Sequence, residues 1–423
     1  MATIMGLDFG TTNSALALSE LGSTRVVRIN NMISDESTLR SVLFMNHKHD
    51  NIVGQRAVEE YIKSEGRSCR FLQSLKTFLS DASFTGTTIF GQRFEIDDLV
   101  SIILKEIKYL GEQHLGHNID QVVMGRPVMF SDEQVCDQLA EKRLRTAASK
   151  AGFKNISFEY EPIAATLAYL KQMDAAKEEI VLMGDFGGGT SDFTVMRLNS
   201  EMPKTQKEKR QRILSMNGVY IGGDTFDSKI MWEKIARHFG KDITLSYDGD
   251  LHQSVPRWIV HTLCEWHAIP FLNERKTLET IRVMKRVADA PKFLENLEHL
   301  IRENKGFAVF RAIEKAKAEL SKNVSSVISY HDKCIHIEET ISRAEFDSFI
   351  EKDLAGISAC VAKTLSDAAI ARERIDKVLL TGGSSFVPAV RKIFCEMFDE
   401  DKIINLDAFT SVAHGLAMSA SFR

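Results

Sequence analysis

Ile180-Val-Leu-Met-Gly-Asp185-Phe-Gly-Gly-Gly189-Thr190-Ser-Asp192 repeats the pattern of Ile4-Met-Gly-Leu-Asp8-Phe-Gly10-Thr11-Thr12-Asn13-Ser14, with 177 positions between the first aspartates of the two stretches. Each stretch is an apolar strand that ends in Asp-Phe-Gly and continues through a Gly/Thr turn into a second strand. Glycine allows positive φ and close backbone approach, so the turn amides can face phosphate oxygens, while the aspartate holds the water shell of a magnesium ion. Two such hairpins predict a clamp on one nucleoside triphosphate.

Two other interpretations of the repeat are weaker. Asp-Phe-Gly also occurs in protein kinases, but this sequence has neither a Gly-x-Gly-x-x-Gly loop nor a His-Arg-Asp catalytic loop. Ordinary Gly-rich hairpins would explain either stretch alone, but they do not explain matched Asp, Gly and Thr positions. The duplication therefore favours a nucleotide site built from two related halves.

Length, charge and cysteine content limit the possible domain organisation, partners and location of the protein. A chain of 423 residues is long for one compact core and favours two α/β lobes. The net charge of -4 gives no support for a nucleic-acid partner, and the six cysteines contain no Cys-x-x-Cys pair, as is typical of reduced thiols. Apolar runs stay short of membrane-spanning length and Met1-Ala2-Thr3 leads directly into a strand. We therefore expect a cytoplasmic protein without a membrane partner.

Hydrophobic periodicity predicts the first lobe over 1–175, completed by about 406–423. Its expected strands lie near 4–9, 14–19, 25–30, 41–45, 121–130 and 156–160. Its expected helices begin at Asp97-Asp98, at a cap formed by Ser131-Asp132-Glu133 and at Glu161-Pro162, the last ending near 174.

The second lobe is expected over 176–405. Residues 199–212 are basic and are interpreted as a solvated hairpin tip. Residues 240–310 lack strand signals and contain two of the three Trp and three of the seven Pro, which favours a largely helical insertion. The remaining expected elements are a helix over 312–321, a strand pair within 326–341, a helix over 343–368, a strand over 376–381 and a closing helix of small residues around Gly415, suited to tight contact with another helix.

A third glycine-rich element is Lys377-Val-Leu-Leu-Thr-Gly382-Gly383-Ser384-Ser385-Phe386-Val387-Pro388, again a strand that leads into a loop and a helix. With these three elements the chain resembles the actin-like ATPase fold, and within it the nucleotide-binding domain of the seventy-kilodalton heat-shock (DnaK-type) chaperones. Further marks of the resemblance are Gly125-Arg-Pro127-Val-Met-Phe-Ser-Asp132, Glu161-Pro-Ile-Ala-Ala165, Ile221-Gly-Gly-Asp-Thr-Phe-Asp227 and Glu314-Lys-Ala-Lys-Ala-Glu-Leu-Ser321.

The resemblance covers most of the chain except roughly 240–310 and points to the short YegD-type branch without a peptide-binding domain. It implies a chaperone-like ATPase that binds ATP or ADP with Mg²⁺ between two lobes and couples slow hydrolysis to lobe movement. The implied partners are the nucleotide and a protein client or cochaperone. On this branch we expect unfolded peptides neither to bind tightly nor to stimulate the ATPase.

The resemblance also implies roles for individual residues. The metal would be held through water by Asp8, Asp185 and Asp192. The catalytic residues would be Lys76, Glu161, Asp192 and Thr190, with Pro127 linking nucleotide state to lobe rotation. The nucleotide would contact Gly10, Thr11, Thr12, Asn13, Gly187, Gly188, Gly189, Gly222, Gly223, Glu314, Lys317, Ser321, Gly382, Gly383, Ser384 and Phe386.

Several positions depart from the family pattern. DnaK-type proteins hold adenine between two arginines, and the matching positions here are Ala318 and Phe386, which implies looser contact with the base. Thr77 replaces a basic residue, and Asp224-Thr225 replaces an acidic pair. The phosphate-binding residues are unaffected by these changes.

Other functions remain open at this stage. A filament-forming actin relative shares the same fold, and so does a small-molecule kinase, which would need a carboxylate base in the cleft. The motifs His261-x-x-Cys264-x-x-His267 and His331-x-x-Cys334-x-His336 have spacings seen at metal sites, but neither offers a second paired cluster, so packed or surface side chains are the favoured interpretation.

Overall fold

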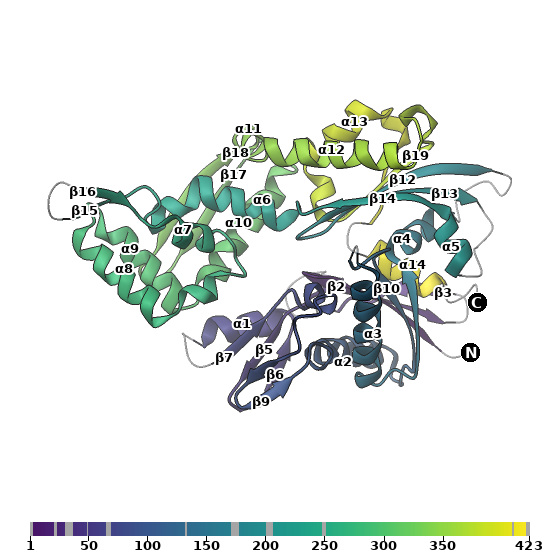
Figure 1. The fold of residues 1–423 in the computed structure, drawn as a ribbon, viewed down its shortest axis with the longest axis horizontal. Helices are drawn as coiled ribbons and strands as arrows, with labels where there is room; N and C mark the ends of the chain where they lie inside the picture. The colour runs from purple at the N-terminus through teal and green to yellow at the C-terminus, as the bar shows by residue number, and fades with distance from the viewer. Residues whose placement is uncertain are drawn as a thin grey trace.

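The computed structural model describes residues 3–20, 23–29, 37–48, 50–64, 69–131, 133–170, 177–199, 206–247, 251–407 and 410–419. Two mixed sheets organise them, one in the lower half and one in the upper half of Figure 1. The first sheet contains β1 (Ile4–Phe9), β2 (Asn13–Glu20), β3 (Ser23–Val26), β4 (Thr38–Arg40), β10 (Gln121–Arg126) and β11 (Asn155–Tyr160). The second contains β12 (Glu178–Phe186), β13 (Ser191–Asn199), β14 (Ile213–Val219), β19 (Lys377–Thr381) and β20 (Ile403–Asn405).

The two sheets share one topology. The strand order is β11-β10-β1-β2-β3 in the first and β20-β19-β12-β13-β14 in the second. In each, the strand that ends in Asp-Phe pairs in parallel with a strand far along the chain and antiparallel with its hairpin partner. The structure thus confirms the duplicated α/β lobes, and it puts the two Asp-Phe-Gly turns at equivalent ends of equivalent strands.

Helices cover both sheets and also lie between them. In the first half these are α1 (Gln55–Lys63), α2 (Ile96–Leu115), α3 (Gln134–Lys150) and α4 (Glu161–Leu170). In the second half they are α5 (Gln206–Arg212), α6 (Gly223–Ile230), α7 (Arg257–Leu263), α8 (Arg275–Val287), α9 (Pro291–Arg302), α10 (Gly306–Leu320), α11 (Arg343–Phe349), α12 (Glu351–Asp367), α13 (Pro388–Met397) and α14 (Ser411–Ser419).

Helices α4 and α14 lie between the sheets and pack against each other, and α14 also packs on β1 and β2 (Figure 1). Small residues make this approach possible, because a Cβ atom at Gly415 would overlap the carbonyl oxygen of Ala164. A Cβ at Gly6 would likewise overlap the backbone of Ala417. The predicted tight contact of the closing helix is therefore confirmed, and it anchors both lobes to one shared pair of helices.

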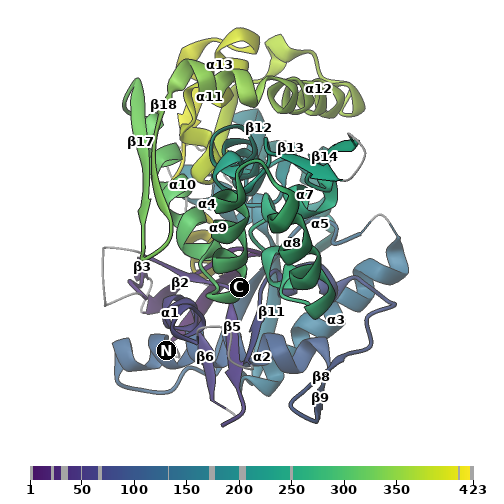
Figure 2. The same cartoon turned by 90° about the vertical axis from the view of Figure 1, so that its left-hand side faces the viewer.

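Each sheet also carries an arm of smaller elements, drawn toward the left in Figure 1 and facing the viewer in Figure 2. On the first lobe the arm holds α1 with β5 (Leu43–Asn46), β6 (Asn51–Val53) and β7 (Cys69–Leu72), while β8 (Thr87–Ile89) and β9 (Gln92–Phe94) form a hairpin near α2. On the second lobe it holds α6 to α10 with the hairpins β15 (Thr244–Tyr247) with β16 (Leu251–Ser254) and β17 (Ser325–His331) with β18 (His336–Ser342).

Three expectations for the second lobe need correction. Residues 240–310 are mainly helical but include the β15–β16 hairpin, whose signal in the sequence is the alternation of residues 243–247 followed by Asp248-Gly249. The basic stretch 199–212 includes a helix, α5, because its residues are good helix formers. The single helix expected over 343–368 is divided at Ile350, which leaves helical geometry and is fully buried.

Two expectations for the first lobe also change. Helix α3 begins after Glu133, but the Glu133 side chain makes no capping hydrogen bond, and Asp132 lies outside the described residues. The described part of α4 ends at Leu170, and residues 171–176 lie outside the described part.

Candidate functional site

The two Asp-Phe-Gly turns face each other across the gap between the lobes. Cross-strand pairs Phe9 with Ser14 and Phe186 with Ser191 close the two hairpins at the same register. A Cβ atom at Gly188 would overlap the Thr12 hydroxyl oxygen, so the second turn can approach the first only with glycine at this position. The Thr12 hydroxyl is buried and has no hydrogen-bond partner in the structure. A buried polar atom costs free energy unless it is paired, so its orphaned state indicates a place for a polar ligand.

The segment Ile221–Asp227 joins the second turn through its backbone. The Gly223 amide donates to the Gly187 carbonyl (3.1 Å), and the Asp224 amide donates to the Gly188 carbonyl (2.8 Å). A Cβ at Gly222 would overlap the Gly188 carbonyl oxygen. The phosphate turn and the start of α6 therefore form one rigid backbone unit.

The third glycine-rich element meets this unit from β19. Gly382 has φ 87° and lies against the Phe186 carbonyl, a conformation and a contact that only glycine accommodates. A Cβ built at Gly223 would lie 3.3 Å from the Ser384 hydroxyl oxygen and 3.4 Å from the Lys317 ammonium nitrogen. The structure thus brings the turns around Gly188, Gly223 and Gly382 to one place, with Lys317 beside them.

The polar residues expected at ribose and adenine have other partners in the structure. Lys317 donates to the Gly223 carbonyl (2.9 Å) and to Asp227 (2.7 Å), and Glu314 accepts from Arg40 (2.6 Å). Ser321 lies just past the end of α10, where its amide donates to the Ala318 carbonyl (3.2 Å). Gly383 and Phe386 are exposed at the mouth of the same turn, Phe386 by 46%.

Four carboxylates surround a single lysine beneath the turns. Lys76 donates to Glu161 at 2.9 Å, and both side chains are nearly buried, 13% and 14% exposed. Burial raises the pKa of Asp8 to about 7, with Glu161 adding to the shift and Lys76 opposing it. Burial, then repulsion from Glu161, Asp192 and Asp8, raises the pKa of Asp185 to about 8. The single ammonium group of Lys76 therefore does not compensate for the burial and mutual repulsion of these carboxylates.

Asp192 and Thr190 complete the carboxylate cluster. The Thr190 hydroxyl donates to Asp192 at 3.0 Å, and Asp192 lies opposite Asp185 in the β12–β13 ladder. Burial raises the pKa of Asp192 although Thr190 acts against the shift. Lys76 keeps a raised pKa despite the opposing effect of burial, because Glu161, Asp8 and Asp185 favour its charged form. Among the described residues no three His, Cys, Asp or Glu side chains converge closely enough for direct ligation of one ion.

A cleft of about 1650 Å³ opens beside the phosphate turns and reaches them at Thr11, Gly189 and Asp224. Its lobe I wall is the segment Cys69–Phe78, and its lobe II wall includes aromatic residues such as Trp232 and Trp266. Asp8, Asp185 and Lys76 are not in its lining. The cleft therefore lies beside the turns and does not extend to the carboxylate cluster beneath them.

The two arms touch above the turns, and we call five of the contacting residues the interlobe clasp: Arg40, Tyr61, Asn304, Phe307 and Glu314. Beyond the Arg40–Glu314 ion pair, Arg40 lies over the Phe307 ring at 5.4 Å, and the Tyr61 hydroxyl donates to Asn304 at 3.2 Å. Phe307, from α10, is buried in a lobe I apolar cluster with Val42, Phe44, Ala57 and Val58. The clasp therefore borders the cleft through Tyr61 and Asn304, and no motif in the sequence indicates that Arg40 or Phe307 belongs to it.

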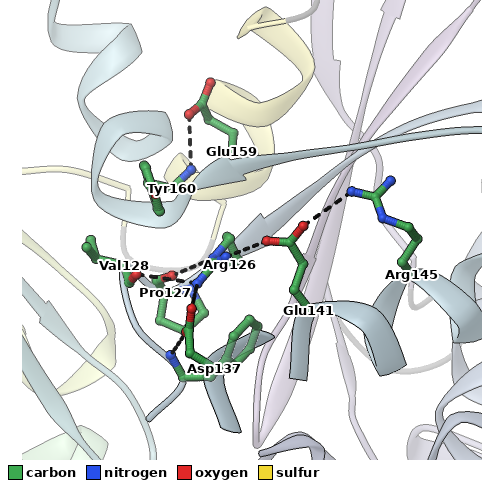
Figure 3. A network of polar contacts seen from close by, with 9 residues as sticks. Arg126, Pro127, Val128, Asp137, Glu141, Arg145, Glu159 and Tyr160 are labelled. Atoms are coloured by element: carbon green, nitrogen blue, oxygen red, sulfur yellow. Dashed lines mark hydrogen bonds and ion pairs between the residues drawn. The ribbon is translucent and has the colours of Figure 1, made fainter. Parts of the chain in front are cut away.

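A buried arginine fixes the segment after β10 (Figure 3). The Arg126 guanidinium donates to the Pro127 carbonyl (3.0 Å), to both oxygens of Asp137 (2.8 and 2.9 Å) and to Glu141. It also lies over the Tyr160 ring at 5.6 Å, directly before Glu161. The segment with Pro127 is thereby tied to α3 at the base of the Lys76–Glu161 pair.

The fold defines the class of protein. Duplicated α/β lobes with two phosphate-type hairpins facing each other are the architecture of the actin-like ATPases. A family model described as "Hsp70 protein" matches residues 76–255 and 302–422. The chain is 25% identical over 430 residues to "Chaperone protein DnaK" of Thermosipho africanus (strain TCF52B), an alignment that covers 99% of this chain and 58% of the relative.

The chain belongs to the Hsp70 family, which confirms the resemblance seen in its motifs. It spans 58% of the length of the chaperone it matches. In the described part of the structure, no helix is both long and apolar enough to cross a membrane.

Proposed function

We propose that this protein is a magnesium-dependent, chaperone-like ATPase that binds ATP between the turns at Thr11 and Gly188 and couples hydrolysis to movement of the two lobes. The observation that supports it most strongly is the convergence of the Asp8 and Asp185 turns around an orphaned Thr12 hydroxyl. Family membership supports the ATPase assignment independently.

The residues fit the nucleotide and its cation. The backbone amides of both turns and the Thr12 hydroxyl would hold the phosphates. Asp8, Asp185 and Asp192 would hold hydrated Mg²⁺, which neutralises phosphate charge when bound, and loss of their protons would accompany its binding. Gly382, Gly383 and Ser384 would meet the sugar and base with Phe386 at the rim.

Phosphoryl transfer needs positioning and charge stabilisation more than covalent chemistry. Lys76 would supply positive charge where negative charge develops, and Glu161, held by Lys76, would orient the attacking water. Thr190, hydrogen-bonded to Asp192, would pass a proton from that water. We further propose that residues 1–175 with about 406–423 act as one lobe and 176–405 as the other, with Pro127 linking the nucleotide state to the rotation of the lobes.

Isothermal titration with ATP in the presence and absence of Mg²⁺ tests this proposal. Wild-type protein should bind ATP only weakly without Mg²⁺, and Gly188→Val should weaken binding strongly because a side chain there overlaps Thr12. Ala371→Val is the control, since Ala371 is exposed and lies outside the lining of the cleft. Equal ATP binding by wild type and Gly188→Val would exclude the two-turn clamp.

The protein partners of this chain are also part of the proposal. Because the named DnaK relative is a chaperone, we propose that a protein client or a cochaperone responds to the lobe movement. A cytoplasmic location remains part of the same proposal.

A further inference from the structure

The hairpin β17–β18 brings two histidines together on its exposed face. His331 and His336 are directly opposite each other at the end of the ladder, and their Nδ1 atoms are 3.4 Å apart. A hydrogen bond between nitrogens at this separation is long. Two nitrogen ligands of a tetrahedral Zn²⁺ ion, each at about 2.0–2.1 Å, lie about 3.3–3.4 Å apart. The measured separation therefore suits a shared metal ion better than a shared proton.

The other ring nitrogen of His331 already has the partner that metal-bound histidines usually have. Its Nε2 donates to Glu338 at 2.6 Å, and the same carboxylate oxygen accepts from the Ser329 hydroxyl at 2.8 Å. A carboxylate on Nε2 fixes the tautomer in which Nδ1 carries a free lone pair, and it increases the basicity of that nitrogen. His331 is thus oriented with Nδ1 as an acceptor.

The other potential ligands of this motif are committed elsewhere. Cys334 packs against the lobe II core rather than the exposed face. Asp332 accepts from His299, from the Tyr330 hydroxyl and from the amides of Cys334 and Ile335. Of the His-x-x-Cys-x-His spacing seen in the sequence, only the two histidines meet, so the cysteine is not part of the site.

The second motif does not assemble. His261 stacks on Trp232 with ring centroids 4.8 Å apart, and Cys264 is buried. His267 lies edge-on to Trp266, a different ring from the one on which His261 stacks. The described residues contain no preformed set of three such ligands anywhere. The pair His331 and His336 therefore differs from the second motif in the short distance between its ring nitrogens, not in the spacing of its residues along the chain.

We propose that His331 and His336 bind one divalent late first-row transition-metal ion through their Nδ1 atoms, with water completing the shell and Glu338 orienting His331. Imidazole nitrogen is a preferred ligand of Zn²⁺, Ni²⁺ and Cu²⁺, whereas Mg²⁺ prefers oxygen, so this site would not compete for the cation of the nucleotide site. The bound ion would join β17 to β18 at the tip of the hairpin. The proposal is independent of the ATPase function.

Titration calorimetry of EDTA-treated, nucleotide-free full-length chain with ZnCl2 tests the site. We expect one equivalent that is lost in His331→Ala/His336→Ala and weakened about 10-fold or more in Glu338→Gln, the range for loss of an outer carboxylate. Cys334→Ser and His267→Ala should bind like wild type. Hydrogen exchange of residues 329–338 should slow with zinc in the wild type and not in the double variant.

Several outcomes would overturn the proposal. Unchanged zinc binding in the double histidine variant would place the ion elsewhere, and loss of binding in Cys334→Ser would make the thiol a ligand. Absence of binding at millimolar zinc would show that the histidines share only a proton. The substituted histidines are exposed, so circular dichroism should show that each variant retains its fold.

Discussion

Replacing Asp185 with Asn is expected to stabilise the nucleotide-free protein, and the gain should grow as the pH rises. The pKa of Asp185 is about 8 in the folded protein, against 3.8 for an ordinary aspartate, because the carboxylate is buried near Glu161, Asp192 and Asp8. The folded state therefore holds a proton between about pH 4 and pH 8 that the unfolded state has lost, and stability falls with pH across that window.

The magnitude follows from the width of the pH interval. Each pH unit well inside the window changes the free energy of unfolding by about 1.4 kcal/mol, so the wild type should lose on the order of 2 kcal/mol between pH 6 and pH 8 through this group. Asparagine keeps the shape of the side chain and does not titrate. The stability difference between Asp185→Asn and wild type should therefore increase by up to that amount and level off above pH 8.

Urea unfolding at pH 6, 7 and 8, with EDTA and without nucleotide, measures this difference. Asp98→Asn is the control, since hydrogen bonds from Lys150 and the Glu95 amide outweigh burial and hold the pKa of Asp98 below its ordinary value. Asp98 is ionised in the folded and in the unfolded protein at pH 6 and above, so the effect of its substitution should not change with pH. An effect of Asp185→Asn that is equally flat would refute the argument that burial destabilises this carboxylate.

Three further outcomes are expected. Lys76→Ala should slow single-turnover ATP hydrolysis by about 10- to 1000-fold while ATP binding largely survives, and an unchanged rate would remove Lys76 from catalysis. Gly415→Ala should lower the free energy of unfolding by about 1–3 kcal/mol in urea, because the added Cβ overlaps the Ala164 carbonyl; a neutral effect would mean that the α4–α14 contact relaxes freely. Arg40→Ala should accelerate release of a fluorescent ADP in stopped flow, whereas Lys315→Ala, exposed next to Glu314 on α10, should not; equal rates would exclude the clasp as a barrier.

The sequence alone determined the class of fold and the position of the phosphate turns. These follow from local chemistry, because an apolar strand, an aspartate and a Gly/Thr turn specify a hairpin wherever they occur, and their repetition specifies two related lobes. The small residues around Gly415 likewise predicted close helix contact, since only side-chain size limits how near two helices approach. The start of the β15–β16 hairpin was within reach of the same reasoning, because residues 243–247 alternate and Asp248-Gly249 follow them.

Only the tertiary structure decided which polar side chains meet. Arg40 and Glu314 are 274 positions apart, and nothing in either local sequence indicates that they pair across the cleft. The same holds for Phe307, which looks like a core residue of its own helix and is buried in the opposite lobe. The raised pKa values of Asp8 and Asp185 also depend on burial and on charges from several strands, which periodicity does not encode.

The two His/Cys motifs show most clearly what the sequence determines and what the tertiary structure decides. Their spacings are similar, yet β-sheet register places His331 opposite His336, while helix packing directs His261 onto Trp232. Spacing in a sequence fixes which residues are near along the chain. Which of them share a face, a charge environment or a ligand is set by packing between distant segments, and that depends on the whole fold.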